Sequence, residues 1–202
     1  MSGFGQFLRR GFSPVLAAIV CGVVLVGTLG FMIHSRAAIL RDGSEIILRT
    51  APVDPRDLMR GDYVRLRYGD ISSVDGALLA GSWPKEDILV PLWLTLVPGD
   101  DGTARVKAVS LEKPDGGNPD AVYLKSKPVM LYGEDHPRTG QVPLRLKFGI
   151  ERYYVPEGEG LEIEKARNAG RTTVAIRVSR DGEPQIARLM IDGQTLYEEP
   201  LY

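Results

Sequence analysis

The segment RGDYVRLRYGD, residues 60–70, carries the side chains of this sequence best suited to binding. If the segment is extended, Tyr63, Arg65 and Arg67 lie on one face of a strand, over about 14 Å at a rise of ~3.3 Å per residue. An aromatic ring beside two guanidinium groups can hold a carboxylate or the polar rim of a partner protein. These three residues are therefore a candidate binding face.

The same segment also has a purely structural interpretation. Asp62 can accept hydrogen bonds from neighbouring backbone N–H groups, and residues 54–61 carry the caps of a single helical turn. The segment is then a turn that starts a strand, with Val64, Leu66 and Tyr68 facing the core. On this interpretation the basic residues form only a solvated face.

No catalytic constellation accompanies the serines of the chain, and we expect no catalytic residue. A serine hydrolase needs a histidine or lysine base beside its nucleophile, and no serine stands in a Gly-x-Ser-x-Gly or comparable frame. Ser126 lies between Lys125 and Lys127, which is more typical of a solvated strand than of a catalytic dyad. Because GDYV matches the Gly-Asp-x-Val strand opening of some membrane-anchored peptidases, an envelope hydrolase is the alternative function.

Glu134, Asp135 and His136 form the one grouping in this domain with the chemistry of metal ligands. They stand in the loop GEDHPR, residues 133–138, and an acidic loop with a proline is far more often a turn. The sequence also lacks a Gly-rich phosphate loop, a cysteine cluster and a haem motif. We therefore expect neither a metal nor another cofactor.

Residues 15–33 form a run of 19 uncharged, mostly apolar residues. As a helix at 1.5 Å per residue, the run is about 28 Å long, close to the ~30 Å hydrocarbon core of a bilayer. A core helix of a soluble protein rarely stays apolar on every face for five turns. A cleaved signal peptide would have a shorter apolar run and a small-x-small cleavage site. We therefore expect one uncleaved transmembrane helix, with the lipid bilayer as a partner.

Arginines flank this helix on both sides and give a moderate positive-inside signal. Arg9 and Arg10 form a tight pair in the short N-terminal tail, which favours a cytoplasmic N-terminus over the alternative set by Arg36 and Arg41. The expected order is a cytoplasmic tail (1–11), a transmembrane anchor (12–34), a linker (35–44) and an extracytoplasmic domain (45–202).

Short alternating segments separated by turn residues predict a mainly β domain, a β-rich α+β fold with one short helix. Strands are expected within residues 45–50, 88–97, 104–112, 121–133, 141–156 and 171–199, with turns at Asp181-Gly182 and Asp192-Gly193. We treat residues 88–97 as one buried strand, in which Pro91 indicates an edge or a bulge. The helix is expected at residues 160–170, where Gly170 suits a C-terminal cap.

One internal likeness and one charge asymmetry complete the pattern. VRLRYG (64–69) and LRLKFG (144–149) share the order aliphatic, Arg, Leu, basic, aromatic, Gly, which indicates either two related β units or chance between alternating strands. Three of the 25 basic residues and none of the 26 acidic residues fall in residues 1–36. The remainder has 22 basic against 26 acidic side chains, so nucleic acid is not an expected partner.

The octapeptide GDYVRLRY resembles the motif of the GDYXXLXY family, uncharacterised bacterial membrane-anchored proteins. Its fixed positions are matched by Gly61, Asp62, Tyr63, Leu66 and Tyr68, and ERYYVPEGEG (151–160) is similar to a later segment of the family. The resemblance implies a location in the bacterial envelope and a multi-span membrane protein as a partner, and it implies no reaction. We therefore expect a periplasmic domain anchored in the inner membrane that acts through protein–protein contacts, accessory to another membrane protein.

Overall fold

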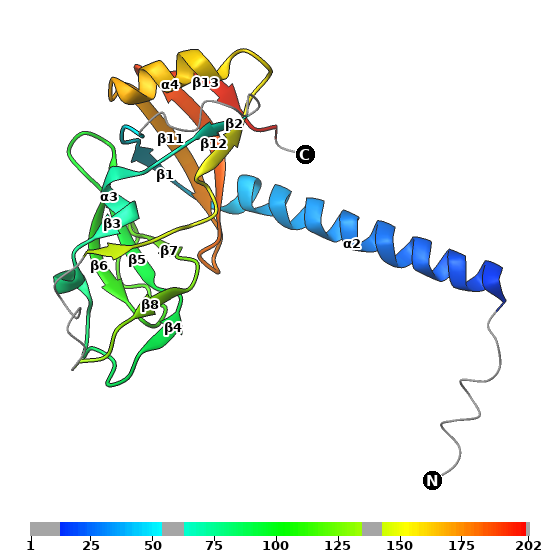
Figure 1. Cartoon of the computed structure of the whole chain (residues 1–202), viewed down its shortest axis with the longest axis horizontal. Helices are drawn as coiled ribbons and strands as arrows, with labels where there is room; N and C mark the ends of the chain where they lie inside the picture. Colours follow the sequence, from blue (N-terminus) through cyan, green and yellow to red (C-terminus); the bar gives the residue numbers. More distant parts are fainter. Residues whose placement is uncertain (1–12, 54–62, 135–142, 201–202) are drawn as a thin grey trace, which may run out of the picture. The chain divides into compact units, whose positions relative to one another are not determined.

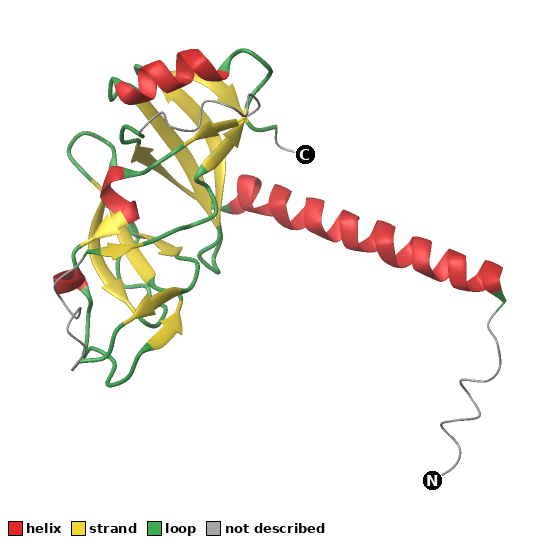
Figure 2. Cartoon of the chain, in the orientation of Figure 1, coloured by secondary structure: helices red, strands yellow, loops and turns green. Residues whose placement is uncertain are grey.

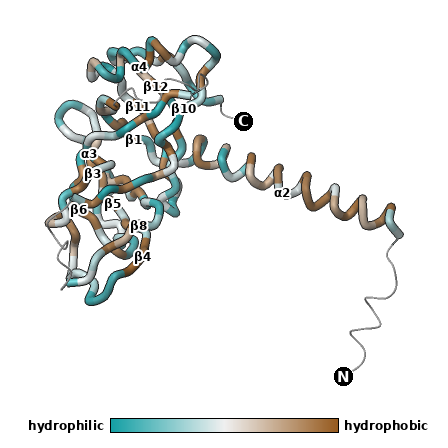
Figure 3. The backbone as a smooth tube through the Cα atoms, in the orientation of Figure 1, coloured by the Kyte–Doolittle hydropathy of each residue, from teal (hydrophilic) through white to brown (hydrophobic). Residues whose placement is uncertain are grey.

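The computed structural model describes residues 13–53, 63–134 and 143–200. The chain divides into two compact units, residues 1–38 and 39–202. The first contains most of α2 (Pro14–Asp42), whose apolar side chains are exposed along residues 15–33 (Figures 1 and 3). Among the described residues, α2 is the one helix long and apolar enough to cross a membrane. The helix also continues through residues 35–42, which were expected to belong to the linker.

The second unit is a β-rich domain, as predicted, with short helices at a few connections (Figure 2). Its four-stranded antiparallel sheet has the order β1 (Ser44–Arg49), β11 (Thr172–Val178), β12 (Pro184–Ile191), β13 (Gln194–Glu198). A three-stranded sheet has the order β6 (Ala104–Ser110), β5 (Trp93–Pro98), β7 (Val122–Lys125). The described residues also form three strand pairs: β2 (Tyr63–Arg65) with β10 (Arg152–Tyr154), β3 (Ser73–Val74) with β9 (Leu144–Arg145), and β4 (Ile88–Val90) with β8 (Val129–Leu131).

In the part of the domain that the structure describes, the helices are α3 (Gly69–Ser72), a 3-10 turn η1 (Gly76–Leu78) and α4 (Gly160–Asn168). The predicted helix at 160–170 is confirmed, including its cap. Gly170 has a left-handed φ of 71° and its N–H donates to the carbonyl of Arg167, while the N–H of Arg171 donates to that of Ala166. This pair of bonds is the Schellman motif that ends many helices.

The prediction of a single strand over residues 88–97 is wrong. Pro91 and Leu92 separate β4 from β5, and the two strands belong to different sheets. Proline lacks the N–H that a continuous ladder needs, so the chain changes partner there. The strand expected at 104–112 is confirmed as β6, and it pairs antiparallel with β5 in a hairpin.

One hydrophobic core joins the two larger sheets and the strand pairs β2–β10 and β3–β9. Its fully buried members come from every part of the domain and include Val64, Leu94, Leu124, Ile163 and Val174. α4 contacts both β2, the strand that contains the start of the described motif, and β11. It therefore covers the core beside β2.

The domain has two halves, residues 44–110 (β1 to β6) and 122–198 (β7 to β13), and each contains a hairpin with the same hydrogen-bonding plan. The hairpins β5–β6 and β11–β12 have the same pairing register when the residue numbers are shifted by 80. Leu94 pairs with Val109, and Val174 pairs with Leu189. Each hairpin has its register shift at the same place, between residues 95 and 96 in one and between 175 and 176 in the other. The turns also match, because the N–H of residues 99 and 179 donates to the carbonyl of residues 103 and 183.

Each hairpin takes its third strand from the other half. β1 pairs with β11, and β7 pairs with β5. Immediately after these strands, the N–H of Thr50 donates to the carbonyl of Thr172 and the N–H of Ser126 donates to that of Leu92, at 3.2 and 2.8 Å. The sequences around these residues, ILRTAPV (47–53) and YLKSKPV (123–129), are correspondingly alike. The likeness of residues 64–69 and 144–149 is therefore part of a repeated architecture.

Candidate functional site: a cationic groove where the two halves meet

The described part of the motif is an extended segment whose side chains alternate between core and surface. Val64, Leu66 and Tyr68 are at most 3% exposed, whereas Arg65 and Arg67 are exposed. This confirms the predicted alternation. Gly61 and Asp62, together with the helical turn predicted at 54–61, lie outside the described residues.

The equivalent segment of the other half repeats this alternation. Leu144, Leu146 and Phe148 are buried, and Arg145 and Lys147 between them are exposed. Each half thus supplies one extended segment with two basic side chains on its outer face.

The two segments run antiparallel and pair at both ends, but not in the middle. At one end β2 pairs with β10, where Arg65 lies opposite Arg152, and at the other β9 pairs with β3. The last bonds before the opening run from the N–H of Leu66 to the carbonyl of Glu151, at 2.9 Å, and from the N–H of Leu146 to that of Ser72, at 3.0 Å. Between these bonds the backbones separate.

The segments separate because each one pairs with a different partner in its middle. The carbonyl of Arg67 accepts from the N–H of Ala51, and the carbonyl of Lys147 accepts from the N–H of Lys127, both at 2.7 Å. Ala51 and Lys127 are equivalent residues of the two halves. Since buried or partly buried backbone groups must be paired, these bonds fix the opening as a feature of the fold.

The opening is a groove with a volume of about 820 Å³. Among the described residues, its lining includes five basic side chains and one acidic side chain: Arg65, Arg67, Arg145, Lys147, Arg152 and Glu151. A volume of this size lies within the range of about 300–1,000 Å³ usual for ligand sites. The domain as a whole is acidic, so this concentration of cations is a local feature.

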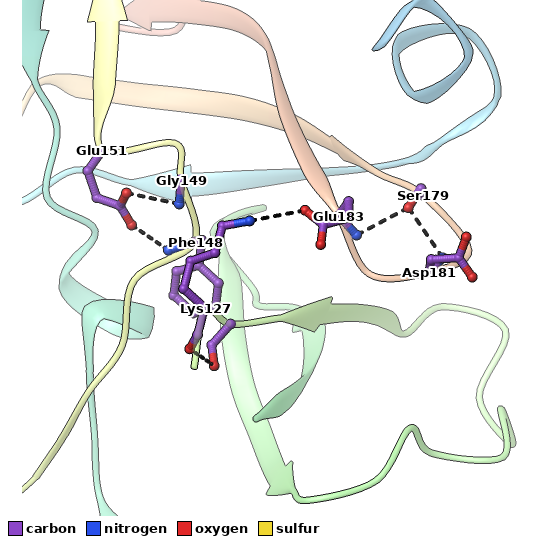
Figure 4. A network of polar contacts seen from close by, with 8 residues as sticks. Lys127, Phe148, Gly149, Glu151, Ser179, Asp181 and Glu183 are labelled. Carbon is purple, nitrogen blue, oxygen red and sulfur yellow. Dashed lines mark hydrogen bonds and ion pairs between the residues drawn. The ribbon is translucent and has the colours of Figure 1, made fainter. Parts of the chain in front are cut away.

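The carboxylate of Glu151 is engaged by backbone donors (Figure 4). It accepts from the N–H of Phe148 at 2.5 Å and from that of Gly149 at 2.9 Å. These bonds hold a tight turn in which Gly149 has a left-handed φ of 88°, a conformation that favours glycine. Within the described residues, no carboxylate forms an ion pair with Arg67 or Lys147. The described residues that line the groove therefore carry a net positive charge.

The model of one protein family, described as GDYXXLXY protein, matches residues 25–189. The chain belongs to the GDYXXLXY family. The match covers most of the chain and includes both segments of the groove. Searches among curated proteins and among solved structures found no match.

Two fixed positions of the GDYXXLXY motif, Leu66 and Tyr68, are core residues in this family member. The hydroxyl of Tyr68 donates to the carbonyl of Ile150 at 2.7 Å and so joins the two segments beneath the groove. Burial, with a smaller contribution from the negative charge of Glu151, raises the pKa of Tyr68 well above its usual value. This tyrosine therefore remains neutral and acts as a structural link.

Tyr63, the third described fixed position of the GDYXXLXY motif, lies beside the groove and does not line it. It lies opposite Tyr154 on β10, with the ring centroids 6.0 Å apart, and the guanidinium of Arg152 lies 5.3 Å from its ring centroid. Tyr154 is 71% exposed. The structure thus brings Arg65 and Arg67 of the predicted face into the groove and places Tyr63 in an aromatic pair next to them.

A buried arginine of α4 positions the GDYXXLXY strand. The guanidinium of Arg167, whose side chain is 2% exposed, donates to the carbonyl of Arg65 at 2.5 Å and to the Asn168 side chain. It also forms an ion pair with Glu164 at 3.7 Å. Burial lowers the pKa of Arg167, and the charge of Glu164 partly offsets this effect. Sequence reasoning missed this residue, because an arginine in a short helix is usually exposed.

The residues considered for hydrolysis in this GDYXXLXY protein have structural contacts. The hydroxyl of Ser126 is buried, accepts from the N–H of Leu92 and donates to the carbonyl of Lys127, both at 2.9 Å. The Nζ of Lys125 lies 5.5 Å from the ring centroid of Trp93, and that of Lys127 pairs with Glu183 (Figure 4). Ser126 therefore has no base beside it among these lysines.

The predicted loop at 133–138 is described only as far as Glu134, and Asp135 and His136 lie outside the described residues. In the part of the chain that the structure describes, no three His, Cys, Asp or Glu side chains are grouped to hold a metal ion.

Proposed function

We propose that this protein is a single-pass, membrane-anchored binding protein of the bacterial inner membrane. Its N-terminus is cytoplasmic, its β domain is periplasmic, and it acts through protein–protein contacts as an accessory to another membrane protein, such as a multi-span one. The length and apolar character of α2 support the anchor. The arginine pair at residues 9 and 10 supports the orientation, and membership of the GDYXXLXY family supports the envelope location.

The observation that carries the binding role is the convergence of basic side chains from both halves on one groove. Arg67 and Lys147 are 80 residues apart in sequence and occupy equivalent places on either side of the opening. Concentrating like charges at one place costs electrostatic energy, and the acidic residues of this domain lie mostly elsewhere. A negatively charged surface of a partner would offset that cost.

Affinity purification from crosslinked native membranes tests this role. The full-length protein is compared with Arg67→Glu/Lys147→Glu, which reverses two groove charges, and with Lys107→Glu/Arg180→Glu, which makes the same charge change at exposed residues outside the groove. An integral-membrane partner should be recovered with the wild type and the control and lost with the groove variant. Recovery of the chain alone, or equal recovery with all three proteins, would contradict the proposal.

The orientation is tested separately with a reporter that is active only in the periplasm, fused after Tyr202. Activity of this fusion, and inactivity of the same reporter fused before Met1, is expected. The reverse result, or release of a shortened chain by a salt wash, would overturn the anchored arrangement.

A further inference from the structure

We propose that the groove binds an extended acidic segment of the partner, with carboxylates at alternate positions. This inference rests on the proposed function and adds the chemical class of the ligand. The described lining of the groove is cationic, and its one carboxylate within that described lining, on Glu151, already accepts from two backbone N–H groups, so the ligand carries negative charge.

The spacing of the basic residues selects an extended ligand. Arg65 and Arg67 alternate along one extended segment, and Arg145 and Lys147 alternate along the other. Alternate side chains of an extended chain are roughly 7 Å apart on the same face. A peptide in the same conformation repeats its own alternate side chains at that distance, so carboxylates at positions i and i+2 match either row of cations.

The equivalence of the two halves gives the groove two such rows, one on each side. The rows come from antiparallel segments that are paired at both ends, so their spacing is set by the backbone. Ion pairs formed on both sides of a bound peptide would hold it along the groove. A small anion would engage only part of this set.

The tyrosines beside the groove suit a peptide ligand. Tyr154 is 71% exposed and lies against Tyr63. Exposed tyrosines next to arginines are typical of protein–protein interfaces, where the ring supplies apolar contact and the hydroxyl a hydrogen bond. The Tyr63–Tyr154 pair therefore provides apolar contact for a residue beyond the acidic stretch.

Fluorescence anisotropy with the full chain in nanodiscs of phosphatidylcholine tests the proposal. The probe is a fluorescein-labelled octapeptide of alternating Glu and Thr. Its controls are a peptide of the same composition with the four Glu residues in a block, and an alternating Gln/Thr peptide. The alternating acidic peptide should bind at least about threefold tighter than the blocked one, the neutral peptide should not bind, and binding should weaken as salt is raised.

The variants separate the groove from general electrostatic attraction. Arg67→Glu/Lys147→Glu should weaken peptide binding by about 30-fold or more, because each reversal replaces an attraction by a repulsion. Lys107→Glu/Arg180→Glu has the same net charge and should stay within about twofold of the wild type. Unchanged melting temperatures of both variants confirm that each is folded.

Equal binding of the alternating and blocked peptides, or equal losses in the two variants, would overturn the proposal. So would binding of vesicles of anionic phosphatidylglycerol without binding of the peptide, or complete displacement of the peptide by millimolar citrate or phosphate. If the peptides fail while partner recovery from membranes still depends on Arg67 and Lys147, the ligand class is wrong and the proposed function stands. If recovery does not depend on these residues, the proposed function itself fails.

Discussion

Replacing Tyr68 by phenylalanine tests whether the last residue of the motif is a structural link between the two halves. The ring is 1% exposed, and its hydroxyl donates to the carbonyl of Ile150 at 2.7 Å. Tyr68→Phe keeps the ring and removes this donor, which leaves a buried carbonyl short of a hydrogen bond. Such a loss costs about 1–3 kcal/mol. We expect a cost of about 1.5 kcal/mol, because phenylalanine is the natural residue at the equivalent position, 148.

Urea unfolding of the full chain in detergent micelles measures this loss, with the fluorescence of Trp83 and Trp93 as the signal. The midpoint should fall while the dependence of the free energy on urea stays unchanged. Tyr68→Ala also removes the ring and should cost about 3–5 kcal/mol.

The matched control is Tyr154→Phe, which removes a hydroxyl from a side chain that is 71% exposed and should change stability by less than about 0.5 kcal/mol. No change in Tyr68→Phe, or a loss as large as that of Tyr68→Ala, would refute the role assigned to the hydroxyl.

The same unfolding assay tests three other features. Gly182→Ala should cost about 3 kcal/mol or more, because its Cβ would lie 2.5 Å from the ring of Trp93. The equivalent Gly102→Ala meets no atom within 4 Å and should cost only about 1 kcal/mol for its left-handed backbone, and equal losses would contradict the close contact of Gly182 with Trp93. Arg167→Met keeps much of the side-chain volume but removes the donor to the motif strand, and should cost about 2–3 kcal/mol, with a neutral result contradicting the positioning role. Burial raises the pKa of Tyr68 in the folded protein, so its contribution to the free energy of unfolding is complete below the unfolded pKa of about 10 and is lost as pH rises above that value. Tyr68→Phe should therefore reduce the loss of stability at alkaline pH. An unchanged dependence of stability on pH would contradict the burial of Tyr68.

Local features of this fold could be predicted from the sequence, because they depend on neighbouring residues. The cap at Gly170 and the turns at Asp181-Gly182 and Asp192-Gly193 follow from the ability of glycine to adopt positive φ. The burial of alternate residues in the motif strand follows from the period of two in an extended chain. These features required no knowledge of which strands pair.

The exchange of strands between the halves depends on residues far apart in the sequence. It could not be predicted from turn residues or from alternation within single strands. Alternation shows that β1 and β7 are strands, and it does not show that each pairs with the hairpin of the other half. The likeness of residues 47–53 to 123–129 was available as a signal. These two segments are 76 residues apart, whereas the other equivalent segments are 80 residues apart. The difference makes the repeat hard to recognise in the sequence.

The candidate site could be predicted only in part for the same reason. Arg65 and Arg67 follow from the motif, whereas Arg145, Lys147 and Arg152 belong to the site only because the second segment runs antiparallel beside the first. The similarity of residues 64–69 and 144–149 was the one clue. It identifies equivalent segments, and contact between them emerges only from the fold.

Photocrosslinking in native membranes tests the central claim, that the groove is the surface at which this protein meets its partner. A photoreactive amino acid is placed in the full chain at position 147, in the groove, and in a second protein at position 107, on the exposed face of β6. The account predicts a crosslink to an integral-membrane protein from position 147, through an acidic segment of that protein, and none from position 107. The same adduct from both positions, or a crosslink from position 107 alone, would contradict it.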